Sequence, residues 1–97
     1  MADSEFEWDE NKNRWNIQER GFGFDRANVV FSRTLLVKRE LRMDYGEPRY
    51  MGIGEMEDGV VIAVVYTIRG LKTRIISARV ASKKERGAYY EYTRKDI

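Results

Sequence analysis

The continuous apolar run VVIAVVYTI, from Val60 to Ile68, decides the fold. A run that is this rich in β-branched residues is typical of a central strand that is covered on both faces or packed deeply. Turn sequences lie on both sides of it, EDG at 57–59 before the run and RGLK at 69–72 after it. The run therefore predicts the middle strand of a sheet whose strands are joined by hairpins.

The segments around this run predict its partners in the sheet. In RYMGIGEM at 49–56, Arg49, Met51 and Ile53 alternate with Tyr50, Gly52 and Gly54. TRIISARVA at 73–81 follows the second turn. LLVKREL at 35–41 is rich enough in branched residues to form a further strand, with DYGEP at 44–48 as the turn after it. We expect an antiparallel meander of three or four strands.

Two helices are expected before the sheet. Phe6–Trp8 is a short extended start, and Asp9 is a suitable N-cap for a helix that runs to about Arg20 and stops at Gly21. The next segment, FDRANVVF at 24–31, has apolar residues at helical spacing and predicts a short second helix.

A third helix is expected after the sheet. Ser82 followed by Glu85 forms a capping box that opens a helix through about Thr93. The order of elements predicts one α+β domain over residues 1–97, with helices gathered against a meander sheet.

The composition limits the chemistry of the chain. It has no cysteine and no histidine, so thiolate and imidazole ligands are absent, and we expect no metal or other cofactor. The start MADSEFEWDE is acidic and does not resemble a signal peptide, and no apolar run is long enough to span a membrane. We expect a cytoplasmic protein that does not contact membranes.

Basic residues gather in the second half of the chain. The net charge is only +2, but the segment 69–86 holds seven Lys and Arg residues against the single acid Glu85. A local positive field of this kind attracts RNA or an acidic partner, although interspersed surface charge is the alternative explanation.

RGFGF at 20–24 matches part of an RNA-recognition motif whose aromatic residues stack bases. The motif should continue with valine and a further aromatic residue on a central strand, whereas Asp25, Arg26 and Ala27 follow here. Gly21 is also expected to end a helix, whereas the motif belongs on a strand, so a generic RNA-recognition domain is not favoured.

Taken whole, the chain resembles the BrnT family of bacterial type II toxins. FEWDENKNRWNIQERGFGF at 6–24, GEPRYMGIG at 46–54, AVVYTIRG at 63–70 and RIISARVASKKERGAYYE at 74–91 are similar to the family's motifs. The resemblance implies a fold related to the RelE-type toxins and a ribonuclease activity. It also implies a partner, a BrnA-type ribbon-helix-helix antitoxin with which the toxin represses its own operon, reaching operator DNA through the antitoxin.

One departure from the family pattern bears on activity. Where the family has Lys-His before the glycine, this chain has Glu19-Arg20. Two hypotheses stay open. The chain is an active RNA-cleaving toxin, or it is a catalytically impaired member that binds the antitoxin and acts as a co-repressor.

Ribonucleases of this kind use a ribose 2′-hydroxyl to attack the adjacent phosphate, which requires proton carriers and cations for the developing charge. Arginine serves the second purpose well because its planar fork binds two phosphate oxygens, but it stays protonated. The catalytic candidates are Lys12, Arg20, Glu47, Arg49, Arg79 and Glu85, and the RNA-binding candidates are Arg74, Lys83, Lys84, Arg86 and Tyr89.

Several of these candidates have a structural alternative. Glu85 is also the capping-box acid, and Tyr89 also suits packing between the helix and the sheet. Arg74 and Arg79 are an odd number of residues apart in one strand, so regular alternation places them on opposite faces unless a bulge intervenes. Of the two, Arg79 is favoured because it lies nearer the final helix.

Overall fold

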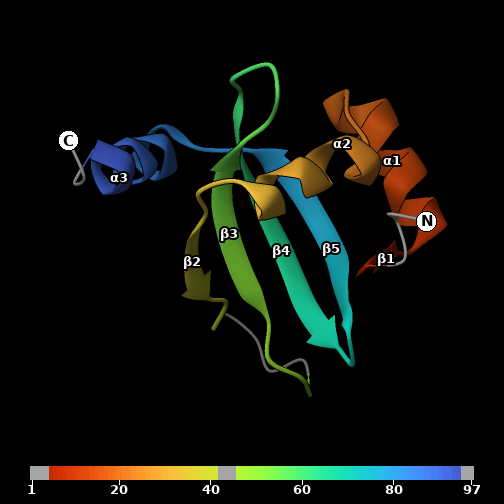
Figure 1. The fold of residues 1–97 in the computed structure, drawn as a ribbon. Coiled ribbons are helices and arrows are strands. Elements are labelled where there is room, and N and C mark those ends of the chain that lie inside the picture. Colours follow the sequence, from red (N-terminus) through yellow and green to blue (C-terminus); the bar gives the residue numbers. More distant parts are fainter. Residues whose placement is uncertain (1–4, 42–45, 95–97) are drawn as a thin grey trace.

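The computed structural model describes residues 5–41 and 46–94. Within these ranges, the chain forms three α-helices, a short 3-10 helix and one mixed sheet with the strand order β1-β5-β4-β3-β2 (Figure 1). The elements are β1 Phe6–Trp8, α1 Glu10–Arg20, α2 Phe24–Ala27, η2 Asn28–Ser32, β2 Leu36–Arg39, β3 Tyr50–Glu55, β4 Val61–Arg69, β5 Lys72–Val80 and α3 Lys83–Arg94.

The expected α+β class and the antiparallel order β2-β3-β4-β5 are confirmed, with β4 in the middle of the sheet. The strand count needs a correction, because β1 pairs in parallel with β5 and makes the sheet five-stranded and mixed. A three-residue strand that joins a partner more than sixty residues away leaves no turn signal in the sequence. Part of the expected DYGEP turn, Asp44 and Tyr45, lies outside the described residues.

The predicted helix caps are confirmed. The side chain of Asp9 accepts hydrogen bonds from the first turn of α1, and Gly21 ends the helix at φ 87, a left-handed conformation that favours glycine. At α3, the backbone N–H of Ser82 donates to Glu85 Oε1 at 2.8 Å, and the backbone N–H of Glu85 donates to Ser82 Oγ at 3.2 Å. These reciprocal bonds are the capping box expected from the sequence.

The predicted second helix is shorter than its apolar spacing suggested. It covers only Phe24–Ala27 before the chain tightens into η2. The β-branched pair Val29 and Val30 lowers the preference for a longer α-helix. Val30 sits directly over Gly54 of β3, where an added Cβ would lie 3.0 Å from the Val30 Cβ, so this glycine lets η2 pack close to the sheet.

Two buried asparagines fix α1 to the loop that follows it. Asn13 Oδ1 accepts a hydrogen bond from the backbone N–H of Phe24 at 2.7 Å, and Asn16 Nδ2 donates to the carbonyl of Phe22 at 2.8 Å. The amides therefore replace apolar residues on the inner side of this helix. They also hold Phe22 and Phe24 in the core.

The sheet has two unlike faces. On one, α1, α2 and η2 enclose the main core, and we call this side the helix face. We call the opposite side the open face. Among the described residues, α3 covers this face only at one end, over residues of β3 and β4. Figure 1 shows α3 projecting beyond the strands. The main core comprises Phe22, Phe24, Ala27, Val30, Met56, Ile62, Val64, Ile75 and Ala78, and the smaller cluster under α3 comprises Met51, Ile53, Val61, Ala63, Ala81 and Tyr89.

Candidate functional site

Cationic side chains gather on the open face of the sheet. The register pairs Ala63 with Arg79, Val65 with Ser77, and Thr67 with Arg74, and each pair shares that face. Lys38 pairs with Met51 in the same row as Val65. Strand pairing thus places basic residues from separate parts of the chain on one surface, namely Lys38, Arg69, Arg74 and Arg79.

A β-bulge brings Arg74 and Arg79 to the same face. Val65 pairs with Ser77 and Tyr66 with Ile75, so Ile76 is an extra residue in β5. The extra residue shifts the alternation by one position, and both Ile75 and Ala78 then face the main core. Regular alternation would place the two arginines on opposite faces, and the bulge brings both to one surface.

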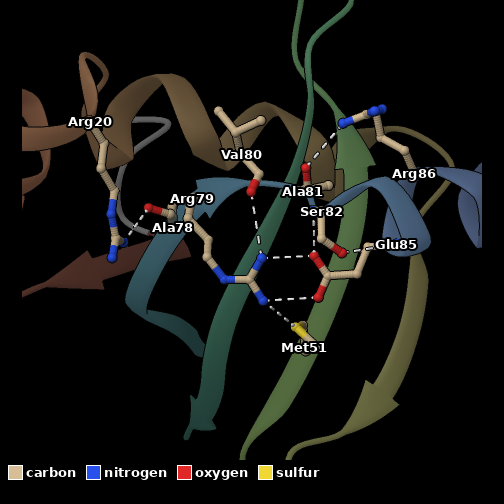
Figure 2. A network of polar contacts seen from close by, with 9 residues as sticks. All are labelled: Arg20, Met51, Ala78, Arg79, Val80, Ala81, Ser82, Glu85 and Arg86. Carbon is tan, nitrogen blue, oxygen red and sulfur yellow. Dashed lines mark hydrogen bonds and ion pairs between the residues drawn. The ribbon is translucent and has the colours of Figure 1, made fainter.

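Arg79 is held by Glu85 from the first turn of α3. Its Nη1 donates to Glu85 Oε1 at 2.7 Å and its Nη2 to Oε2 at 2.9 Å, in a two-pronged ion pair (Figure 2). The Arg79 Nη2 also lies 3.7 Å from the sulfur of Met51. The pair fixes the guanidinium beside a hollow of about 450 Å³, which Lys38 also lines.

Glu85 is therefore the capping-box acid and the partner of Arg79 at once. The hydrogen bonds from Arg79, supported by the backbone N–H of Ser82, lower the pKa of Glu85 to about 2. A carboxyl with this pKa stays ionised at neutral pH, so it carries no proton to give and accepts one poorly. The geometry makes Glu85 a positioning residue for Arg79.

We predict that Glu85→Gln lowers stability at neutral pH but not in strong acid. The folded-state pKa lies below its usual value of 4.5, so the ion pair contributes fully above about pH 4.5 and is lost as the pH falls towards about 2. The variant should lose about 1 kcal/mol at pH 7, or roughly 4–8 °C in Tm, since the pair is partly exposed.

Thermal unfolding of both proteins across this pH range tests the prediction. The difference in Tm should shrink as the pH falls, and it should nearly vanish at pH 7 when Arg79 has already been replaced by glutamine. A difference that is the same at every pH would contradict the role assigned to the ion pair.

A second group of charges lies at the other end of the open face. Arg69 binds Glu47 through Nε at 3.2 Å and Nη2 at 3.1 Å, and Arg49 Nη2 lies 3.7 Å from the same carboxylate. The hydrogen bond from Arg69 lowers the pKa of Glu47. Arg74 pairs with Glu7 of β1 at 3.6 Å. The rows of Arg74 and Arg79 are four β4 residues apart, about 13 Å along the strand.

Lys12 and Arg20 lie elsewhere, on α1 beside the outer edge of β5. Arg20 Nη1 donates to the carbonyl of Ala78 at 2.9 Å (Figure 2). Both residues line a pocket of about 250 Å³ between α1 and that edge. The six catalytic candidates are thus divided among three places, Arg79 with Glu85, Glu47 with Arg49, and Lys12 with Arg20.

The RNA-binding candidates also differ in their surroundings. Lys83 and Lys84 are exposed in the first turn of α3, and Arg86 Nη1 donates to the carbonyl of Ala81 at 3.3 Å. Tyr89 is only 4% exposed, and its hydroxyl donates to the carbonyl of Thr34. Burial raises the pKa of this hydroxyl. A ring in this position packs α3 against the sheet and presents no open surface to a base.

Sequence reasoning did not select Lys38, Arg69 or Glu7 as site residues. Glu7 and Lys38 reach the open face through pairing with other strands, and the sequence carries no signal of that register. Arg69 was expected in a turn and as a member of the basic segment 69–86. The turn itself is the two-residue link Gly70-Leu71, with Gly70 at φ 62, and Arg69 precedes it as the last residue of β4.

Within residues 5–41 and 46–94, no group of three or more acidic side chains is placed to hold a metal ion. None of the helices in the same ranges has the length and apolar character needed to cross a membrane.

Comparisons with known proteins define the class of this chain. A family model described as the ribonuclease toxin BrnT of type II toxin–antitoxin systems matches residues 8–85. The crystal structure of the Brucella abortus ribonuclease toxin BrnT is similar, with 30% sequence identity and a TM-score of 0.57, and the match covers 78% of this chain and 94% of that one. No curated protein sequence matches the chain.

The chain is therefore a member of a class of ribonuclease toxins that belong to type II toxin–antitoxin systems. It belongs to the BrnT family. The resemblance noted from the sequence motifs is confirmed, and an antitoxin partner is expected because the family forms toxin–antitoxin systems.

Proposed function

We propose that this protein is an endoribonuclease toxin that cleaves RNA on the open face of its sheet and so arrests translation and growth in the cytoplasm. The observation that carries the proposal is the fixed guanidinium of Arg79, held by Glu85 within a surface that also presents Lys38 and Arg74. A planar guanidinium in a set orientation suits two oxygens of a phosphate.

In this proposal, a ribose 2′-hydroxyl gives its proton to solvent and attacks the adjacent phosphate. A 2′,3′-cyclic phosphate forms as the bond from phosphorus to the 5′-oxygen breaks, and that oxygen takes a proton from solvent. Arg79 binds the charge that develops on the phosphate oxygens. Arg74, Arg49, Lys83, Lys84 and Arg86 would hold the flanking phosphates, which lie along a strongly negative chain. Glu85 and Glu47 are poor proton carriers at neutral pH because bound arginines lower both pKa values. Electrostatic stabilisation, rather than strong acid–base catalysis, would therefore provide most of the rate enhancement.

The proposed partner is a BrnA-type antitoxin with a ribbon-helix-helix DNA-binding domain. The family's place in type II toxin–antitoxin systems supports this proposal. The complex would neutralise the toxin and repress their operon, with operator DNA bound by the antitoxin and not by this chain.

A second candidate function follows from Arg20. Its guanidinium lies 4.8 Å from the Trp15 ring centre and bonds to Asn16 and Ala78, so it has a structural role where the family has histidine. Arginine at this position transfers protons poorly. The alternative is thus a catalytically impaired toxin that still binds the antitoxin and acts as a co-repressor.

Induction of the chain without its antitoxin separates these functions. We expect growth arrest and RNA breakdown from the unmodified chain, and a rate increase of about 10²–10⁴-fold with Arg20→His if an imidazole restores acid–base catalysis. RNA cleavage that appears only with histidine restored would support the impaired co-repressor and refute an active nuclease.

A further inference from the structure

The pocket between α1 and β5 lies at an uncovered strand edge. β1 pairs with β5 only from Thr73 to Ile75, so the edge beyond Ile75 has no neighbouring strand among the described residues. The bulged Ile76 and the following Ser77 form one wall there. The full lining is Lys12, Trp15, Asn16, Arg20, Phe24, Ile76 and Ser77.

The lining combines an aromatic surface with unpaired donors. Trp15 is 51% exposed although it is a large apolar side chain. The guanidinium of Arg20 lies over the Trp15 ring, 4.8 Å from its centre, and both of its hydrogen bonds use Nη1. In the described part of the chain, Nε and Nη2 therefore have no hydrogen-bonding partner. Within the same residues, neither the ammonium of Lys12 nor the hydroxyl of Ser77 has a hydrogen-bonding partner. Two of these three groups can only donate.

We propose that this pocket binds one unpaired guanine base of the RNA substrate. The inference rests on the proposed ribonuclease function. A base fits the flat, partly apolar wall because bases stack on tryptophan rings and on arginine planes. Guanine is the base that presents two neighbouring acceptors, O6 and N7, which arginine and lysine donors bind most often.

The residue Ser77 links the pocket to the proposed phosphate site. Ser77 lines the pocket and also belongs to the open face, in the row between Arg74 and Arg79. An RNA strand whose phosphate lies at Arg79 can therefore pass over the β5 edge and place a neighbouring base beside Trp15. Phosphate contacts carry no sequence information, so the pocket would determine the sequence preference of cleavage.

Binding of RNA that cannot be cleaved tests the pocket apart from the reaction. The probes are fluorescent 2′-O-methyl oligonucleotides, which lack the attacking hydroxyl, with a uridine background and one variable position. That position carries guanine, 7-deazaguanine, uracil or no base. The unmodified protein should bind the guanine probe roughly 5- to 150-fold more tightly than the abasic probe, with 7-deazaguanine between them.

Three variants locate the preference. Trp15→Ala should remove most of it, and Ser77→Ala should reduce it without changing the aromatic surface. The matched control is Ile17→Ala, an exposed apolar residue of α1 outside the pocket, which should keep the full preference.

Equal affinity for all four probes would overturn the proposal, as would an unchanged preference in both pocket variants. Parallel cleavage of unmodified RNA keeps the two proposals apart, since equal probe affinities alongside cleavage reject only the guanine pocket. The guanine-pocket proposal would also be rejected if Trp15→Ala abolished antitoxin binding but kept the guanine preference. The pocket would then bind the partner protein.

Discussion

Arg79→Gln should reduce the rate of RNA cleavage by about 10²–10³-fold, as the loss of one preorganised donor does at other sites of developing negative charge. Glutamine keeps a planar polar group but loses the charge and the two-pronged fork that binds Glu85. The cleavage rate of Arg79→Lys should lie between those of the unmodified protein and Arg79→Gln, because a lysine provides charge without that fork. The Arg79 substitutions are to be made in a parent protein that cleaves RNA, either the unmodified chain or Arg20→His, and their cleavage rates compared with that parent.

The matched control for Arg79 is Arg26→Gln. Arg26 also forms an ion pair, with Asp58 at 3.1 Å, but this pair lies on the exposed surface away from the open face. Its loss should leave cleavage unchanged. If Arg79→Gln is folded and cleaves RNA as fast as the control, the phosphate does not bind at Arg79.

Phe24→Ala should lower the free energy of unfolding by about 3–5 kcal/mol, which is a large part of the stability of a small domain. The ring is 1% exposed and lies edge-on to Trp8, with 6.1 Å between ring centres. Its removal opens a cavity between α1, α2 and the sheet, where the neighbours are too constrained to close it.

Denaturant unfolding measures this effect, with Tyr92→Ala as the control. Tyr92 is a large aromatic residue on the exposed side of α3, so its truncation should change stability by no more than about 0.5 kcal/mol. Similar losses in both variants would mean that Phe24 is not part of a close-packed core.

The sequence predicted the features that neighbouring residues determine. The caps of α1, the capping box of α3 and the hairpins around β4 depend on residues a few positions apart, and all three are present. Arg79 was favoured because it lies nearest the final helix, and Glu85 was selected as a proton carrier in the capping box of that helix. The structure joins the two in an ion pair.

Features set by distant pairing were missed. The parallel pairing of Phe6–Trp8 with β5 joins segments at opposite ends of the sheet's sequence. The approach of Lys38 to Met51 depends on the register between β2 and β3. From the sequence, a bulge could be named only as an exception to regular alternation in this strand. It could not be placed at Ile76, because an extra residue among β-branched residues leaves no sequence signal. For the same reason, the shared face of Arg74 and Arg79 could not be read from their spacing.

The double use of Glu85 links the orientation of Arg79 to the docking of α3. One carboxylate oxygen accepts hydrogen bonds from both Arg79 and the N-terminus of that helix. Fraying of the first helical turn and release of the guanidinium are therefore a single local unfolding event. A protein that drew α3 away from the sheet would therefore inhibit the proposed phosphate site without covering it. RNA could still reach the surface, but Arg79 would no longer be held in place there.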